Sequence, residues 1–189
     1  IKQLDFVNRI FTSETSDLAI LTPKILNTDD LLPEAQFSLS LYEEDLIIGE
    51  HGFSVGFPKG APGQALLKFG GYVNMIQSGA YHLKEPVKMW VEFTREPRNL
   101  DNMGGISGGP IFNSGGSIVG VHVANSIRRG RAFSVDINAI SGFLNVTNTR
   151  YNAAISKNPP VIDLQNWKNV ADKWRKEKLI RKVFCKTAK

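Results

Sequence analysis

A single serine, Ser107, stands among four glycines in the stretch Gly104-Gly105-Ile106-Ser107-Gly108-Gly109-Pro110. A nucleophilic serine needs a backbone that presents its hydroxyl outward and directs N–H groups at the oxygen where negative charge develops. Glycines allow both, because a residue without Cβ reaches positive φ and lets a substrate approach the main chain closely. The amides of Gly105 and Ser107 are therefore candidate donors of an oxyanion pocket.

The residues that follow argue against a flexible Gly/Ser linker. Pro110-Ile111-Phe112 leads into the turn Asn113-Ser114-Gly115-Gly116 and then into a second apolar run, a pattern typical of a β-hairpin. Other short apolar or alternating runs predict further strands. The predicted strands cover residues 4–11, 18–21, 51–57, 65–76, 87–93, 111–112, 118–123 and 132–135. Many short strands with helices gathered at the end favour a β-barrel or sandwich core.

Two helices are expected in the last third of the chain. The first begins at Asp136, a good N-cap, and places Ile137, Ile140 and Leu144 on one face. The second covers about residues 163–184, after the break at residues 158–160. Its apolar residues fall on two opposite faces, which predicts a kink or a second packing partner.

The composition bounds the class of protein. The chain has 189 residues, of which 42% are apolar, so it can bury a substantial core. No apolar run approaches the ~20 residues that span a bilayer. The single cysteine, Cys185, rules out a disulfide within the chain, argues against a cysteine-built zinc site and slightly favours a reducing compartment such as the cytoplasm. The residues indicate no metal and no cofactor.

The positive charge is concentrated at the C-terminus. Residues 167–189 carry nine Lys or Arg against two acids, a net charge of +7, whereas residues 1–166 carry 14 bases against 16 acids, a net charge of −2. The basic character therefore says nothing about what the main domain binds. An acidic partner for the tail is one interpretation, but a solvated helix face explains the charges more simply, and nucleic acid is not expected as a ligand.

Three segments together resemble the trypsin-like serine endopeptidases of the chymotrypsin fold. The stretch from Gly105 to Pro110 resembles the G-x-S-G-G-P nucleophile motif of that family. Ser16-Asp17-Leu18-Ala19-Ile20-Leu21 is similar to the segment around the triad aspartate, and it precedes Ser107 in the family's order and at about its spacing. Gly56-Phe57-Pro58 resembles the opening of the second barrel. The resemblance implies a mainly β, chymotrypsin-like double barrel with C-terminal helices, of which this chain holds the second barrel and the end of the first.

By that resemblance Ser107 is the nucleophile and Asp17 the acid that orients a histidine base. The family carries this histidine some 40 residues or more before the aspartate, but only sixteen residues precede Asp17 here. His51, His82 and His122 all lie downstream, where a base is not expected. The resemblance therefore places the base upstream of Ile1. The alternative is a protease-like domain that has lost catalysis and binds peptides.

The resemblance also indicates a pocket for the substrate side chain before the cut, termed P1. His122, in Gly120-Val121-His122-Val123, stands where glutamyl endopeptidases carry a pocket histidine, and it favours Glu or Gln. Asp101, six residues before Ser107, stands where trypsin keeps the aspartate that selects Arg or Lys. Asn102 and Val123 are assigned to the same pocket. We predict Glu or Gln over Arg or Lys.

Ile106 marks one departure from the digestive enzymes. They have an aspartate just before the nucleophile, which pairs with a newly cut N-terminal amine to complete the oxyanion pocket. Ile106 cannot make that ion pair, so activation in that way is not expected.

The predicted organisation has three parts. Residues 1–30 are the last strands of the first barrel and the link, residues 31–150 are the second barrel with its closing helix, and residues 151–189 are a proline-containing linker and a basic helix. Three functions remain open: a serine endopeptidase acting on protein or peptide substrates, an inactive peptide-binding module, and an adaptor that binds nucleic acid or lipid through the basic tail.

Overall fold

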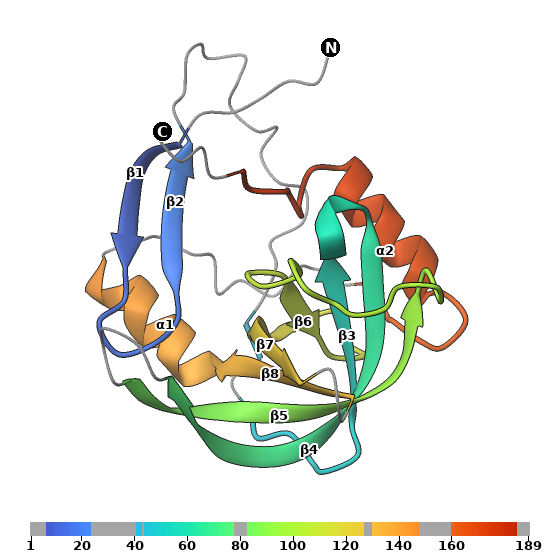
Figure 1. The fold of residues 1–189 in the computed structure, drawn as a ribbon, viewed down its shortest axis with the longest axis horizontal. Helices are drawn as coiled ribbons and strands as arrows, with labels where there is room; N and C mark the ends of the chain where they lie inside the picture. The colour runs from blue at the N-terminus through green and yellow to red at the C-terminus, as the bar shows by residue number, and fades with distance from the viewer. Residues whose placement is uncertain are drawn as a thin grey trace.

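The computed structural model describes residues 7–23, 41–42, 44–77, 83–126, 130–147 and 160–184. In these ranges a closed antiparallel barrel forms the body of the molecule, with a separate two-stranded hairpin and two α-helices around it (Figure 1). None of the helices in these ranges has the length and apolar character needed to cross a membrane.

The barrel is built from six strands, each paired with its neighbours in antiparallel register. Around the barrel their order is β3 (His51–Gly56), β4 (Gly63–Gln77), β5 (Leu83–Glu96), β8 (Arg131–Asp136), β7 (Ile118–Ser126) and β6 (Pro110–Phe112), which pairs back onto β3. Six of the predicted strands are thereby confirmed. The run at 65–76 forms one long strand, and β5 extends beyond the predicted residues 87–93 at both ends.

The remaining strands, β1 (Val7–Thr12) and β2 (Ala19–Pro23), pair only with each other. Their hairpin lies beside α1 and outside the closed barrel (Figure 1). Val7, Ile10 and Phe11 are exposed on it, although they are large and apolar. The described residues thus form one closed barrel and one hairpin that is not part of the barrel. The predicted boundary at residue 30 falls outside them.

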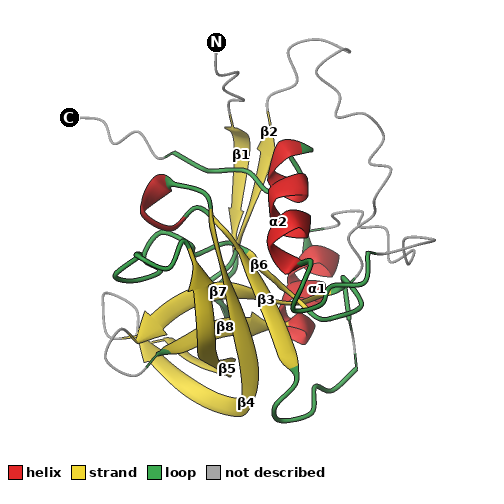
Figure 2. Ribbon diagram, turned by 90° about the vertical axis from the view of Figure 1, so that its right-hand side faces the viewer, coloured by secondary structure: helices red, strands yellow, loops and turns green. Residues whose placement is uncertain are grey.

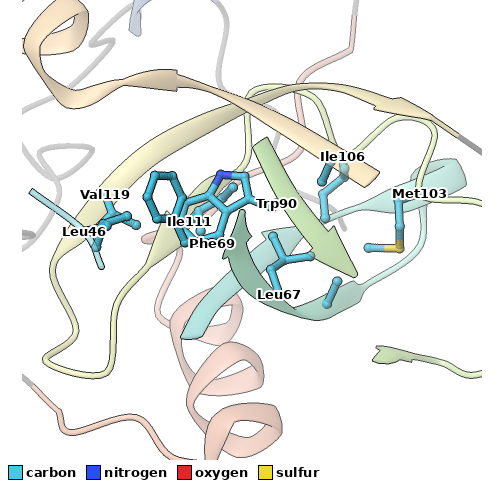
Figure 3. Close-up of a cluster of buried hydrophobic side chains, with 10 residues drawn as sticks. Leu46, Leu67, Phe69, Trp90, Met103, Ile106, Ile111 and Val119 are labelled. Atoms are coloured by element: carbon cyan, nitrogen blue, oxygen red, sulfur yellow. The ribbon is translucent and has the colours of Figure 1, made fainter. Parts of the chain in front are cut away.

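Apolar side chains fill the barrel interior, as Figure 3 shows around Trp90 and Phe69. These two rings meet edge to face at 5.4 Å between centroids, a favourable aromatic geometry. Strand β3 is buried on both faces, because its glycines and Ser54 point inward while Phe53 and Val55 pack outside the barrel. Gly52 is required there, since a Cβ at that position would lie 2.6 Å from the Trp90 ring.

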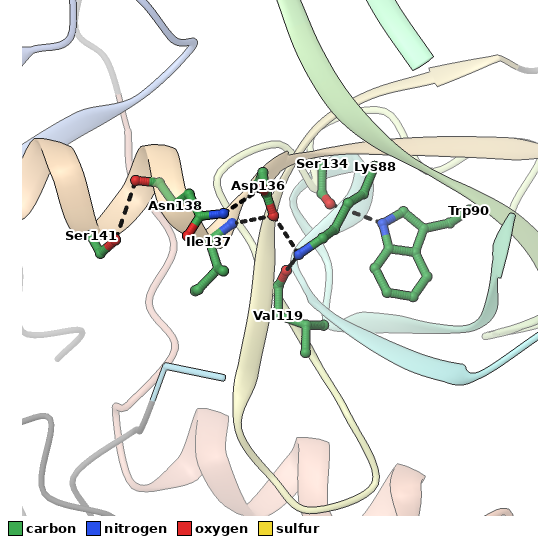
Figure 4. Close-up of polar contacts among 8 residues, drawn as sticks. All are labelled: Lys88, Trp90, Val119, Ser134, Asp136, Ile137, Asn138 and Ser141. Carbon is green, nitrogen blue, oxygen red and sulfur yellow. Dashed lines mark hydrogen bonds and ion pairs between the residues drawn. The ribbon is translucent and has the colours of Figure 1, made fainter. Parts of the chain in front are cut away.

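Helix α1 (Ile137–Val146) begins directly after β8, with Asp136 as its N-cap as predicted. The Asp136 carboxylate accepts a hydrogen bond from the Ile137 amide at 2.7 Å. It also pairs at 2.5 Å with Lys88, whose side chain is 1% exposed and donates a second hydrogen bond to the Val119 carbonyl (Figure 4). A buried cation is tolerated here because an anion and a carbonyl oxygen both solvate it.

The second helix is shorter than the sequence predicts. Helix α2 covers Trp167–Lys176 rather than residues 163–184. Before it, the Asp163 carboxylate accepts hydrogen bonds from the main-chain amides at positions 165 and 166 and forms a turn. After it, Lys178 adopts φ +62° and ends the helix. The expected interruption between the two apolar faces is therefore a left-handed turn at Lys178, after which Leu179 and Ile180 pack in the same cluster as the helix.

We refer to residues 160–184, α2 and its flanks, as the C-terminal strap. The strap lies along the outer face of the barrel near β3 and β6 (Figure 2). It buries Ile162, Trp167, Ala171, Trp174 and Ile180 against Phe53, Val55, Leu66 and Phe112. The strap therefore covers an apolar outer face that would otherwise be exposed to water.

Candidate active site

The glycine-rich segment forms a tight turn before β6. Gly105 has φ +88° and Gly108 has φ +84°. Side chains are disfavoured in this region of backbone conformation, so glycine is required at both positions. The Ile106 amide donates to the Met103 carbonyl at 3.1 Å, and the Gly109 amide donates to the Ile106 carbonyl at 2.8 Å. Ile106 is only 1% exposed, whereas Ser107 is exposed at the tip of the turn.

Strand β7 holds this turn on its other side. The Gly108 amide donates to the His122 carbonyl at 2.8 Å, and the His122 amide donates to the Gly109 carbonyl at 2.9 Å. The Ser107 hydroxyl donates to the Val123 carbonyl at 3.2 Å. The structure thus brings three residues of the predicted site together where β7 meets the turn before β6: Ser107, His122 and Val123.

Two main-chain amides of the turn are available to a ligand. Among the described residues, neither the Gly105 N–H nor the Ser107 N–H donates a hydrogen bond. Both residues are exposed, so water or a ligand can satisfy these N–H groups. The two amides are those that the sequence proposes as the oxyanion donors, and that role stays a prediction.

His122 is buried, with 1% of its surface exposed. Its Nε2 lies 2.9 Å from Asn125 Oδ1, and its Nδ1 lies 3.4 Å from Ser54 Oγ. Burial lowers the pKa of His122 to about 4, although the hydrogen bond to Asn125 opposes that shift. The imidazole is therefore neutral at pH 7, and it offers a single N–H donor.

Asp101 and Asn102 both make contacts that order the loop before the turn. The Asp101 carboxylate is exposed and pairs with Lys59 Nζ at 2.7 Å, a contact that lowers the pKa of Asp101. The Asn102 side chain accepts a hydrogen bond from the Gly104 amide at 2.9 Å. An open hollow beside Asp101 is lined by Glu92, Thr94, Arg95, Arg98, Leu100 and Asp101, without Ser107 or His122. The pocket roles of Asp101 and Asn102 remain predictions.

Asp17 lies at the tip of the β1–β2 hairpin and is exposed. Its amide donates to Glu85 Oε2 at 3.2 Å. Among the described residues, no hydrogen bond or ion pair connects Asp17 with Ser107 or with a histidine. His51 lies on β3 with its ring 6.4 Å from that of Phe53, and His82 falls outside the described residues. The triad role of Asp17 therefore remains a prediction.

Several residues that contact the predicted site residues or the loop before Ser107 were not predicted. Glu85 is buried beside Asp17, burial raises its pKa, and its Oε1 has no hydrogen-bond partner among the described residues. Asn125 and Ser54 orient the His122 ring, and Lys59 contacts the loop before Ser107. Alternation placed Ser54 in a strand, but no sequence signal indicated its partner, because the contact joins separate elements. The described residues contain no cluster of three potential metal ligands among His, Cys, Asp and Glu.

A scan against models of known protein families finds no match, and neither does a search of curated protein sequences. Solved structures do match. The inactive form of a serine-to-alanine mutant of Rv3671c from M. tuberculosis has a TM-score of 0.56 and 18% identity, over 77% of this chain and 66% of that one. The active form of the Rv3671c protease has a TM-score of 0.58 and 18% identity, over 75% of this chain and 57% of that one.

These likenesses establish the fold, which is mainly β and chymotrypsin-like, with a closed six-stranded barrel and two helices among the described residues. The fold predicted from the sequence is confirmed. The matched region spans two thirds or less of the neighbours' own chains.

Proposed function

We propose that this chain is the nucleophile-bearing part of a serine endopeptidase that hydrolyses protein or peptide substrates. The observation that carries the proposal is the exposed Ser107 hydroxyl, on a glycine turn whose Gly105 and Ser107 amides are unpaired among the described residues, in a barrel of chymotrypsin-like fold. The structural neighbours are described as proteases, which supports the same reaction class.

In the proposed reaction, Ser107 Oγ attacks the carbonyl carbon of the scissile peptide, and its proton passes to a histidine base. That histidine lies upstream of Ile1 in the proposal, with Asp17 as its orienting acid. The amides of Gly105 and Ser107 stabilise the negative charge on the carbonyl oxygen. Removal of one such donor typically slows an enzyme by about 10²–10³-fold, so the shape of the turn matters as much as the hydroxyl.

Two contacts favour Glu or Gln as the P1 residue over Arg or Lys. The Asp101 carboxylate is already neutralised by Lys59, which weakens its attraction for a cationic substrate. His122 is neutral with one N–H, which an amide or carboxylate oxygen of the substrate can accept in place of Asn125. Cleavage of peptides that differ only in Glu, Gln, Arg or Lys at P1 tests this preference, and faster cleavage after Arg or Lys would contradict it.

A fluorophosphonate probe, which reacts with activated serines, tests the reaction class. We expect labelling of the protein extended upstream to include the histidine, loss of labelling in Ser107→Ala, and unchanged labelling in the control Ser114→Ala. Ser114 is also exposed, but it lies in the turn between β6 and β7. Absence of labelling in the extended protein would reject the hydrolase.

One observation favours the second candidate, an inactive peptide-binding module. The Ser107 hydroxyl donates to the Val123 carbonyl, and no described histidine side chain forms a hydrogen bond with it. This candidate predicts no labelling by the probe, together with retained binding of a Glu- or Gln-containing peptide, measured by fluorescence anisotropy.

A further inference from the structure

Ile106 occupies the position of the activating aspartate of the digestive enzymes, so a different contact has to hold the turn at residues 105–109, here called the oxyanion turn. Ile106 is buried against β3. A Cβ at Gly56 would lie 2.7 Å from Ile106 Cγ1, so the side chain fits into the space that this glycine leaves. This contact fixes the middle of the turn, but it does not reach the loop at residues 101–104, which carries the chain into Gly105.

Lys59 holds that loop through both its main chain and its side chain. Its amide donates to the Gly104 carbonyl at 2.7 Å, and its ammonium group pairs with Asp101 at 2.7 Å. Gly105 packs directly on the Lys59 backbone, since a Cβ at Gly105 would lie 3.3 Å from the Lys59 nitrogen. Lys59 itself has φ +49°, in a 3-10 turn at Pro58–Gly60. The turn at Pro58–Gly60, here called the Lys59 turn, therefore holds the loop at residues 101–104 in place.

The C-terminal strap in turn holds the Lys59 turn. Lys182 Nζ donates to the Gly60 carbonyl at 2.9 Å. Arg175, on α2, donates to the Gly63 carbonyl at 3.1 Å and to the Gln64 side chain at 2.5 Å. The Arg175 side chain is only 7% exposed, so these contacts are made largely out of water. An unbroken series of contacts thus runs from the strap to the Lys59 turn and on to Gly104.

We propose that Lys59 is a positioning residue for the oxyanion turn, and that the C-terminal strap sets the position of Lys59. This inference rests on the proposed hydrolase function, because it assigns a catalytic purpose to the contacts. It accounts for the absence of the activating aspartate: the strap and Lys59 take over the ordering of the turn. In this proposal the basic residues Arg175 and Lys182 contact other parts of the same chain rather than an external partner.

The test is made in the protein extended upstream to include the histidine. It compares Lys59→Met and Lys182→Met with Lys176→Met, a control that removes an exposed lysine at the C-terminal end of α2. Because the Lys59–Asp101 pair is exposed, we expect Lys59→Met to lower kcat and the rate of Ser107 labelling about two- to fivefold, with KM unchanged. Lys182→Met should act in the same direction, and the double variant should show less than the combined loss, since both act through one turn. Lys176→Met should match the wild type.

A charge exchange separates positioning from a general loss of stability. Lys59→Asp combined with Asp101→Lys restores the ion pair, so we expect it to recover most of the lost kcat. Equal kcat and labelling in Lys59→Met and the wild type, or a fall in melting temperature alone, would overturn the inference.

A second readout does not depend on catalysis. The amides of Gly104 and Ile106 are hydrogen-bonded, so their hydrogen exchange, followed by NMR, reports opening of the loop. We expect faster exchange in Lys59→Met and Lys182→Met than in Lys176→Met. If the extended wild-type protein is not labelled by the probe, the hydrolase proposal fails, and faster exchange would still show that the strap and Lys59 order the loop. Unchanged exchange would overturn the positioning itself.

Discussion

At the scale of single residues, burial decides the chemistry of His122. The ring has almost no contact with water, and its hydrogen bonds to Asn125 and Ser54 do not compensate a positive charge fully. Desolvation disfavours the charged form of a buried imidazole. It therefore lowers the pKa of His122 from 6.5 to about 4. In this state the ring offers a single N–H donor, and its protonation is coupled to unfolding.

We predict that the free energy of unfolding falls as the pH drops from about 6.5 to about 4. In that window the unfolded chain protonates His122 and the native protein does not, so the proton favours unfolding. The pKa difference corresponds to about 3 kcal/mol in total. Urea unfolding at pH 7 and pH 4 should show this loss in the wild type and a smaller one in His122→Gln.

The comparison with His122→Gln also removes the contribution of Glu85. Burial raises the pKa of that carboxyl group, so its contribution to stability is present at low pH and is lost as the pH rises through the native pKa. Glu85 contributes equally in both proteins. An identical pH dependence in wild type and His122→Gln would contradict the buried, neutral histidine.

At the scale of elements, one carboxylate joins a strand to a helix. Asp136 ends β8, caps α1 and neutralises Lys88 of β5. The sequence indicated only the cap, because a cap is local, whereas Lys88 lies far earlier in the chain. Alternation along 87–93 gave no sign that a lysine would point to the buried side. The pairing of β5 with β8 places Lys88 opposite Ser134, close to the helix start.

The variant Asp136→Asn separates the two roles of this residue. Its amide oxygen still accepts from the Ile137 amide, but the buried Lys88 ammonium loses its anion. We expect a destabilisation of about 3 kcal/mol in urea unfolding, most of which Lys88→Met should restore in the double variant. Asp163→Asn, at an exposed turn, is the control. A loss that Lys88→Met does not relieve would assign the effect to the helix cap.

At the scale of the whole molecule, the barrel and the C-terminal strap share one apolar cluster. Trp174 packs on Phe112 with ring centroids 4.1 Å apart, and Trp167 lies in the same cluster. Among the described residues, no other element packs on the outer face of β3 and β6 or on the apolar side of α2. The two parts are therefore expected to unfold together.

We predict that Trp174→Ala destabilises the barrel as well as the helix, by about 3–5 kcal/mol, the usual cost of a large cavity. Circular dichroism reports the helices. In a Trp167→Phe background, fluorescence reports Trp90, inside the barrel, alone in the Trp174→Ala variant and together with Trp174 in the reference protein. Both transitions should shift together, and Lys176→Ala on the exposed side of α2 should shift neither. A barrel transition that keeps its midpoint would show that the strap is only attached to an independent barrel.

The sequence by itself determined the features that depend on neighbours along the chain. Alternation and turn residues located the barrel strands, Asp136 located the start of α1, and the glycines around Ser107 indicated a turn with positive φ. These patterns are local, because a strand, a cap and a tight turn each depend on a few consecutive residues.

Only the tertiary structure decided what depends on residues far apart in the chain. It ended α2 at Lys176, where a left-handed turn at Lys178 brings Ile180 into the shared cluster. It buried Lys88, neutralised Asp101 with Lys59, placed Lys182 on the turn that supports Gly104, and placed Arg175 on Gly63 at the start of β4. Each of these contacts joins separate elements, and the periodicity of one segment carries no information about its partner.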